Sequence, residues 1–548
     1  MSRARPWYPA VLLLFLFATS AIATDDAAPP LYDGLGGLTR KITTSSADAQ
    51  RYFDQGLAFL YAFNHDEAIR SFGYAAQLDP GCAMAWWGVA YAHGPHINNP
   101  IVTEEHAQAA WAALTKARTA AVGASAVEKA LVAALAKRYA DPQPDDRAPL
   151  EQAYAAAMRD VWQAYPQDAD VGALFAEALA NLRPWDLWLP DGTPQPGTED
   201  LVATLDAVLR VDPKHPLANH LLIHAVEASL HPERADRAAD ALRDLQPGLG
   251  HLTHMPSHVD VRRGRWQEAV VANTKAIAAD RAYVARAPEP GFYRLYMAHN
   301  FHMLTYGAMM TGQSELALAT ISEMVDGIPL EFFANNPFMD GFKAMPLEVM
   351  MRFGRWDQIL AVPAFPDYVP ISRALQHYAR AVSYAAQNDL VNARKEAAAF
   401  AQAKARVPEE ATFGNNTGAD VLAVAEPFMQ GEILYRSGEV DAGLAALRDA
   451  VAREDALRYD EPPSWIQPVR HAYGAALLQA GRFAEADAVF REDLARLPNN
   501  GWGLYGLMRA LELQDKKAEA QEVERQFEAA WQDADVEIRS PCLCLPGV

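Results

Sequence analysis

Two stretches of the sequence, far apart in the chain, share one spacing of small, aromatic and proline residues. Residues 52–80 read YFDQGLAFLYAFNHDEAIRSFGYAAQLDP, and residues 468–498 read PVRHAYGAALLQAGRFAEADAVFREDLARLP. In the first stretch, intervals of 12, 4, 3 and 5 separate Gly56, Ala68, Phe72, Ala75 and Pro80. In the second, intervals of 12, 4 and 8 separate Gly474, Ala486, Phe490 and Pro498. The coinciding offsets predict one structural unit that recurs along the chain.

These positions resemble the tetratricopeptide repeat (TPR), a helix-turn-helix unit of about 34 residues with small residues where its helices touch. The resemblance extends into the following units, where Trp86 takes the early aromatic place and Ala520 the small place of the second helix. It implies that Phe72 fills the gap to the next unit and that each helix pair is stabilised by stacking on its neighbours. We therefore expect an all-α fold, a right-handed solenoid of irregular TPR-like helix pairs.

The rest of the chain alternates amphipathic segments of helical periodicity with short breaks, and no stretch shows a convincing strand pattern. Further turns are marked by glycines at irregular spacings of 48, 42, 84 and 43 residues: Gly264, Gly312, Gly354, Gly438 and Gly481. The repeat is most disturbed at residues 95–213, where prolines interrupt the helices. Within that part, residues 183–197 indicate a substantial loop that contains Trp185 and Trp188.

The order of the segments predicts an exported protein of bacterial type. Arg3 and Arg5 precede an apolar run at residues 11–18, and Ala23 suits a signal peptidase, so we expect a signal peptide at residues 1–23. The remainder divides into a leader (24–50), N-terminal TPR-like helices with the Pro/Trp-rich loop (51–213), central His-rich units (214–365) and C-terminal TPR units with a Cys-Leu-Cys tail (366–548). No later segment is apolar enough to span a bilayer, so a periplasmic or secreted location without a membrane span after cleavage is expected.

Charge and missing motifs argue against several classes of function. The 548 residues include 69 acidic and 48 basic side chains, a net charge of −21, whereas binding to nucleic acid requires clustered Lys and Arg. The sequence lacks the motifs of a phosphate-binding loop, a serine-hydrolase elbow and an HExxH zinc helix, so no nucleotide cofactor is expected. Whether the protein is an enzyme stays open, and any catalysis would depend on a bound metal.

Histidines concentrate in one window of the chain, because nine of the 15 lie between His215 and His302. We align the central units by the small residue of the second helix in each unit. Histidines then recur at the second, fifth and ninth places of the first helix in successive units. The aligned sets are His220, His224 and Glu227, then His251, His254 and His258, then His299, His302 and Tyr306. In the TPR family these places face the concave groove, so the resemblance implies that seven histidines and one glutamate point into one cavity.

Helical spacing independently places the members of each set on one helix face, because residues three or four apart are neighbours on a helix. Imidazole is a common ligand of transition metals, so the hypothesis is a metal site, with copper or zinc preferred to iron. The first-choice ligands are His220, His224, His254, His258, His299 and His302, with His251 and Glu227 as ligands or as hydrogen-bond partners of ligands. Methionines at positions 255, 297, 303, 309 and 310 favour copper unless they are core residues.

Two other interpretations of the histidines stand beside the metal site. They could line a metal-free groove that binds a peptide or protein segment, or they could be structural residues with satisfied hydrogen bonds. Tyr293, Tyr296 and Tyr306 are candidate groove residues that contact a substrate, or core aromatics if the histidines are structural.

The cysteines and one loop histidine complete the candidates. Cys82 is expected to be buried, and Cys542 and Cys544 to form a solvent-facing pair. The alternative for this pair is a set of soft metal ligands or a redox pair. His96, in the loop at residues 94–100, is expected to hydrogen-bond its own turn, and a cap over the histidine cavity is the alternative.

Overall fold

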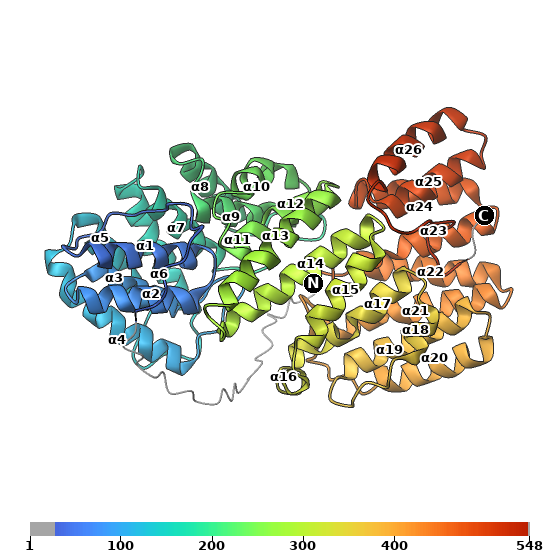
Figure 1. Ribbon diagram of the computed structural model, residues 1–548, viewed down its shortest axis with the longest axis horizontal. Coiled ribbons are helices and arrows are strands. Elements are labelled where there is room, and N and C mark those ends of the chain that lie inside the picture. Colours follow the sequence, from blue (N-terminus) through green and yellow to red (C-terminus); the bar gives the residue numbers. More distant parts are fainter. Residues whose placement is uncertain (1–27, 546–548) are drawn as a thin grey trace, which may run out of the picture.

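The computed structural model describes residues 28–545, and helices make up most of it (Figure 1). The N-terminal helices are α1 (Ala47–Tyr61), α2 (His65–Leu78), α3 (Ala83–Ala92), α4 (Glu104–Ala120), α5 (Ala126–Leu135), α6 (Ala148–Ala164), α7 (Ala169–Ala180) and α8 (Thr198–Val211). The central helices are α9 (Pro216–Val226), α10 (Asp236–Leu242), α11 (Gly250–His254), α12 (Pro256–Arg262), α13 (Trp266–Val284), α14 (Arg294–Met310), α15 (Ser314–Asp326), α16 (Leu330–Asn335), α17 (Met345–Arg352) and α18 (Trp356–Ala361).

The C-terminal helices are α19 (Pro370–Ala386), α20 (Leu390–Lys404), α21 (Gly418–Arg436), α22 (Val440–Asp455), α23 (Val469–Gln479), α24 (Phe483–Arg496), α25 (Gly501–Glu512) and α26 (Lys517–Ala530). Between residues 28 and 545, the only strands are β1 (Thr412–Phe413) and β2 (Asn416–Thr417), which form a short antiparallel hairpin. The all-α class is therefore confirmed. The signal peptide expected at residues 1–23 lies outside the described residues.

The helix pairs expected at both ends are confirmed, and they show why the spacing of small and aromatic residues matters. Helix α1 packs on α2, and α23 packs on α24. The ring of Phe72 is buried between Gly56 of α1 and Gly88 of α3, where an added Cβ would come within 2.6 and 2.5 Å of ring atoms. Only glycine leaves room for this ring, so Phe72 locks one helix pair to the next.

The same contact recurs near the C-terminus, where Phe490 of α24 lies between Gly474 of α23 and Gly506 of α25. A side chain at either glycine would overlap the phenylalanine ring. The helix pairs are thus joined by the same packing at both ends of the array.

The buried apolar side chains form two clusters, which meet in the central helices. One extends from Ile42 to Tyr296 and the other from Val261 to Leu545. Helix α14 belongs to both, because Tyr296 near its start packs in the first cluster and Met303 further along packs in the second. In Figure 1, α14 accordingly lies between the N-terminal helices and the C-terminal helices.

The loop expected at residues 183–197 is confirmed as a non-helical connection between α7 and α8. Its indole groups fix it to α9 and to the loop between α3 and α4. Trp188 Nε1 donates to the carbonyl oxygen of Ala225 in α9 at 2.8 Å, and Trp185 Nε1 donates to Asn98 Oδ1 at 3.0 Å. The described helices contain no segment long and apolar enough to cross a membrane.

Candidate metal centre

Three central segments of the chain bring the histidines together. Helix α9 carries His220 and His224 and ends at Glu227, its C-terminal capping residue. Helices α11 and α12 carry His251, His254 and His258, and Met255 alone separates them. Helix α14 carries His299 and His302.

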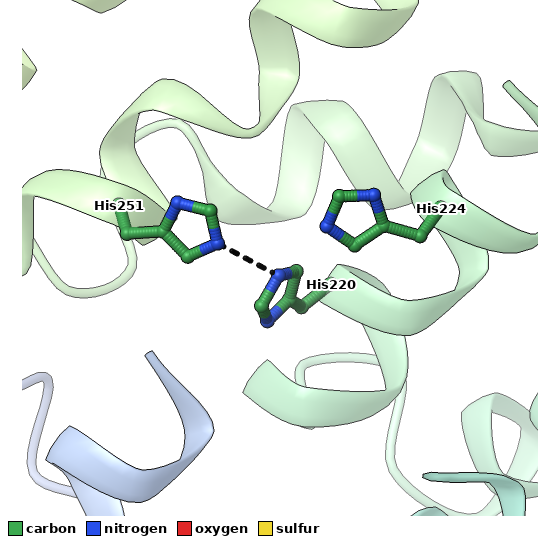
Figure 2. Close-up of side chains that lie close together, drawn as sticks. All are labelled: His220, His224 and His251. Atoms are coloured by element: carbon green, nitrogen blue, oxygen red, sulfur yellow. Dashed lines mark hydrogen bonds between the residues drawn. The ribbon is translucent and has the colours of Figure 1, made fainter. Parts of the chain in front are cut away.

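The first group of histidines, called here the first trio, consists of His220, His224 and His251. Each offers a ring nitrogen, and these nitrogens lie within 4.8 Å of one another. Nε2 of His251 is 3.1 Å from Nε2 of His220, and the three rings point toward one another (Figure 2). All three side chains are buried.

A second trio consists of His254, His258 and His299, whose ring nitrogens also lie within 4.8 Å of one another. Nε2 of His258 is 2.7 Å from Nε2 of His254 and 3.4 Å from Nε2 of His299. His254 and His258 are buried, and His299 is partly exposed.

Hydrogen bonds to the outer nitrogens of the first trio fix two tautomers. Nδ1 of His220 lies 2.9 Å from the carbonyl oxygen of Tyr61, and Nδ1 of His224 lies 2.9 Å from Glu227 Oε1. A carbonyl oxygen and an oxygen of an ionised carboxylate can only accept a hydrogen bond. Both Nδ1 atoms therefore carry the proton. The Nε2 atoms of His220 and His224 are therefore left with lone pairs, and Nε2 of His224 has no hydrogen-bond partner.

The tautomers of His254 and His258 in the second trio are fixed in the same way, by acceptors at Nδ1. Nδ2 of Asn273 donates to the carbonyl oxygen of Ala269 at 2.8 Å, which turns Asn273 Oδ1 toward Nδ1 of His254 at 2.6 Å. Nδ1 of His258 lies 2.6 Å from Glu227 Oε2. Both contacts require the proton on Nδ1, so the Nε2 atoms of the neutral rings face each other with lone pairs.

Burial keeps most of these rings in the state that binds metal. Burial and the neighbouring imidazoles hold the pKa values of His220, His251 and His254 well below that of a free histidine, so these rings are neutral at pH 7. Neutral imidazole is the form that coordinates a metal ion.

Glu227 supplies the negative charge between the two trios. Burial opposes its ionisation, but His258 and His224 outweigh that effect and lower the pKa of Glu227 to about 2. Burial likewise opposes protonation of His258, but the Glu227 carboxylate raises the pKa of that ring. Metal-free, His258 can therefore hold an extra proton and donate it to His254.

A carboxylate that sequence reasoning missed joins this network. Glu461 forms a further potential ligand group with Glu227 and His258, in which the ligand atoms lie within 4.8 Å of one another. It comes from the loop between α22 and α23, where no periodic pattern marks it, and burial raises its pKa to about 7. Tyr61 and Asn273, which orient the histidines, were also absent from the predicted set.

The network borders a cavity of about 800 Å³. His224, Glu227 and Glu461 line this cavity, together with Trp185 and Trp188 of the loop between α7 and α8. Its wall combines aromatic rings with charged side chains, and its volume suits a small molecule or a short peptide segment.

The three predicted groove tyrosines have different surroundings. The ring of Tyr296 lies 4.4 Å from that of His251, whereas the hydroxyl of Tyr293 accepts a hydrogen bond from the backbone nitrogen of His251 at 3.0 Å. Tyr306 lines the cavity and packs on Trp266. All three are buried.

Two further predicted histidines, His302 and His96, belong to neither trio. His302 lies outside both trios, where its ring contacts Phe342. His96 has the first of its expected roles, because its Nδ1 accepts from the backbone nitrogen of Asn98. Its ring stacks on Phe63, which in turn contacts His220, but His96 does not line the cavity.

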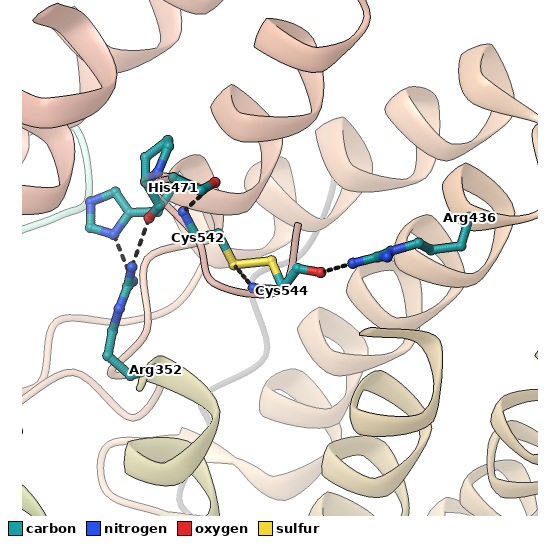
Figure 3. Close-up of a disulfide and its surroundings, with 7 residues drawn as sticks. Arg352, Arg436, His471, Cys542 and Cys544 are labelled. Carbon is teal, nitrogen blue, oxygen red and sulfur yellow. Dashed lines mark hydrogen bonds between the residues drawn. A yellow bond between two sulfur atoms is a disulfide. The ribbon is translucent and has the colours of Figure 1, made fainter. Parts of the chain in front are cut away.

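The C-terminal cysteines are not solvent-facing, which corrects that expectation. Cys542 and Cys544 are buried and joined by a disulfide (Figure 3). Arg352 of α17 donates to the carbonyl oxygen of Pro541 at 2.7 Å and Arg436 of α21 to that of Cys544, so the tail is held between helices. Their sulfur atoms are bonded to each other and lie in no potential ligand group with the histidines. Cys82 is buried, as expected.

Comparison with known proteins yields similarity only at the level of solved structures. No protein-family model matches the sequence, and no curated protein matches it. A human IFIT1 dimer with m7Gppp-AAAA is 12% identical, with a TM-score of 0.32 and coverage of 89% of this chain and 91% of that chain. Yeast Tom70 is 14% identical, with a TM-score of 0.27 and coverage of 89% and 92%. The APC/C hetero-tetramer Cut9–Hcn1 is 10% identical, with a TM-score of 0.29 and coverage of 89% and 74%.

Proposed function

We propose that this chain is an exported, TPR-like helical scaffold that binds a transition metal in its central histidine network. The metal would be held by imidazole nitrogens of one or both trios, beside the cavity. From there it would serve metal binding itself or metal-dependent chemistry on a peptide or small molecule in the cavity. Copper and zinc are the proposed ions, with iron as a further candidate.

The observation that carries this proposal is the set of fixed tautomers. His220, His224 and His254 each direct a protonated Nδ1 to an oxygen acceptor, and each leaves an Nε2 lone pair inside the network. Histidines that ligate metals characteristically donate their outer N–H to a carboxylate or carbonyl, which orients the ring and makes the inner nitrogen a better ligand.

The unpartnered Nε2 of His224 supports the same conclusion. It is a buried acceptor with no donor among the described residues, and it lies on a ring that lines the cavity. Leaving such an atom unpaired costs about 1–3 kcal/mol, which a metal ion at this place would recover.

The choice of metal rests on the imidazoles. Met255, Met303, Met309 and Met310 pack in the two hydrophobic clusters, so their thioethers give little support to copper. The proposed export to the periplasm or outside the cell is supported by the disulfide between Cys542 and Cys544, since disulfides persist in oxidising compartments.

A metal-free scaffold that binds a peptide or protein segment is the alternative. The raised pKa of His258 favours it, because an extra proton on that ring can satisfy the close contact with His254 without a metal. In that case the cavity would bind its partner through aromatic and charged side chains.

The test is elemental analysis of protein purified without a His tag. We expect bound copper, zinc or iron in the wild type and a lower metal content in His254→Ala/His299→Ala, which removes two histidines of the second trio. The matched control is His231→Ala/His377→Ala, which also removes two histidines, each paired with a glutamate outside the trios. A folded wild type that holds no metal even after reconstitution with Zn²⁺ or Cu²⁺ would favour the peptide-binding alternative.

A further inference from the structure

The histidine network contains twice the number of imidazoles that a single open metal site needs. Each trio consists of three histidines, and the two trios share none of them. We infer that the network binds two metal ions, one in each trio, with Glu227 between them. This inference rests on the proposed metal binding and specifies how many ions are bound and where.

The distances within the trios support two separate ions. Ligand nitrogens on one tetrahedral zinc ion lie about 3.3 Å apart, since each Zn–N bond is about 2.0–2.1 Å long. Nε2 of His220 and His251 are 3.1 Å apart in the first trio, and Nε2 of His258 and His299 are 3.4 Å apart in the second. Each trio therefore already holds one pair of nitrogens at ligand spacing.

A single ion cannot use all six rings. Zinc and copper in imidazole sites take about four ligands, and an open site uses about three protein ligands. An ion held by one trio would leave the other trio's buried nitrogens without a cation, including the close Nε2 atoms of His254 and His258. A second ion would use those nitrogens as its ligands.

Glu227 is placed to serve both ions. Its Oε1 accepts from Nδ1 of His224 in the first trio, and its Oε2 contacts Nδ1 of His258 in the second. One buried carboxylate thus orients a ligand of each ion and offsets part of the repulsion between two cations. Glu461, in contact range of Glu227 and His258, adds a second carboxylate on the cavity side.

The two trios also differ in their surroundings. The first trio reaches the cavity through His224, whereas no residue of the second trio lines it. The ion of the first trio is therefore the one that a molecule in the cavity would meet.

The test is a Zn²⁺ titration of the full-length, chelator-treated protein, with the number of bound ions read by native mass spectrometry. We expect two ions in the wild type, one in His251→Ala, one in His299→Ala and none in the double variant. The control His231→Ala/His377→Ala should retain two.

Different results would overturn this inference and the proposed function. One ion in the wild type, removed by either single variant, would overturn the two-ion inference and leave the proposed metal binding in place. Loss of both ions in each single variant would overturn the assignment of one ion to each trio. A wild type that binds no ion would overturn both proposals.

A measurement on the wild type alone covers the case in which a variant fails to fold. With two equivalents of Cu²⁺ bound, neighbouring ions should broaden the electron paramagnetic resonance spectrum and reduce its integrated intensity. Two equivalents that give the full signal of isolated ions would overturn the inference.

Discussion

The helix pairs at the ends of the array and the helices in its centre bury very different side chains in comparable positions. In α1–α3, Phe72 fills the space between Gly56 and Gly88, and the contact is entirely apolar. In α9–α14, buried histidines meet one another and Glu227 instead. Buried polar groups are expensive unless they are fully paired, which is why we propose a ligand for the central network.

Under the proposed function, the two regions separate what holds the molecule together from what it binds. The end contacts depend on shape and apolar area, and the central contacts depend on protons, charge and the proposed metal ion. Changes in one region should leave the property of the other unaffected, which gives a direct way to test the comparison.

The largest effect on stability is expected from Phe490→Ala, which empties the space between Gly474 and Gly506. Such a substitution of a buried phenylalanine costs about 3–5 kcal/mol in free energy of unfolding. Chemical denaturation would measure the loss, and Val391→Ala, at a position that is 79% exposed, is the control. The metal content of the folded protein should stay unchanged; its loss would break the separation between the two regions.

The next largest effect is expected on metal affinity, from Glu227→Gln in the central histidine network. Removing the carboxylate that orients His224 and His258 should weaken metal binding about 10–100-fold, as is typical for partners of metal ligands. Competition with a chelator of known affinity measures the change. Glu396→Gln is the matched control, because Glu396 also contacts a histidine, His377, but lies outside both trios. Equal affinities for the two variants would contradict a role for Glu227.

Two carboxylates, Asp170 in α7 and Glu348 in α17, should give stability opposite dependences on pH. Burial opposes ionisation of Asp170 in α7, but His215 and Arg40 lower its pKa, so the stability it contributes is lost only as the pH falls through that low value. Burial raises the pKa of Glu348 in α17 to about 8. The folded chain then keeps a proton that the unfolded chain has lost, so stability declines as the pH rises from about 4.3 toward 8.

Glu348→Gln tests this difference, because glutamine cannot ionise. We expect the melting temperature of the variant to fall less than that of the wild type between pH 5 and pH 8, by a few degrees. Thermal unfolding followed by circular dichroism measures both profiles, and Asp389→Asn, at a surface carboxylate, should follow the wild type. Parallel profiles for wild type and Glu348→Gln would show that Glu348 is ionised in the folded protein.

The smallest effect is expected from Cys542→Ser/Cys544→Ser. The disulfide closes a very short loop, with a sequence separation of 2, so it restricts the unfolded chain little. Differential scanning calorimetry should show a shift of about 2 °C or less. Unchanged metal content is expected as well, and a loss of metal would contradict the separation of this tail from the histidine network.

Local spacing, together with the resemblance to a helical repeat that it carries, was enough to predict the fold class and most of the histidines that lie together. The glycine and aromatic positions around Phe72 and Phe490 act within a few turns of helix, and so do the histidines of α9, α11 and α12. The structure brings together His220, His224, His251, His254, His258 and His299 with Glu227. His302 is on the same helix as His299 but lies outside the trios and contacts Phe342.

What the sequence could not reveal depends on contacts between distant segments. Glu461 lies in the loop between α22 and α23, and only the fold of the whole chain brings this loop to Glu227 and His258. The carbonyl group of Tyr61 carries no side-chain signal at all. The burial of the Cys542–Cys544 tail follows from hydrogen bonds with Arg352 and Arg436, which helical periodicity does not indicate.

The most direct test of the central claim is X-ray absorption spectroscopy of the zinc-loaded protein, because an acidic chain with a net charge of −21 can also bind metal at surface carboxylates. The proposed centre predicts a first shell dominated by nitrogen at about 2.0–2.1 Å, with the outer-shell scattering of imidazole rings. This signal should disappear in His254→Ala/His299→Ala combined with His251→Ala. A first shell made of oxygen alone, unchanged in that variant, would contradict metal binding by the histidine network.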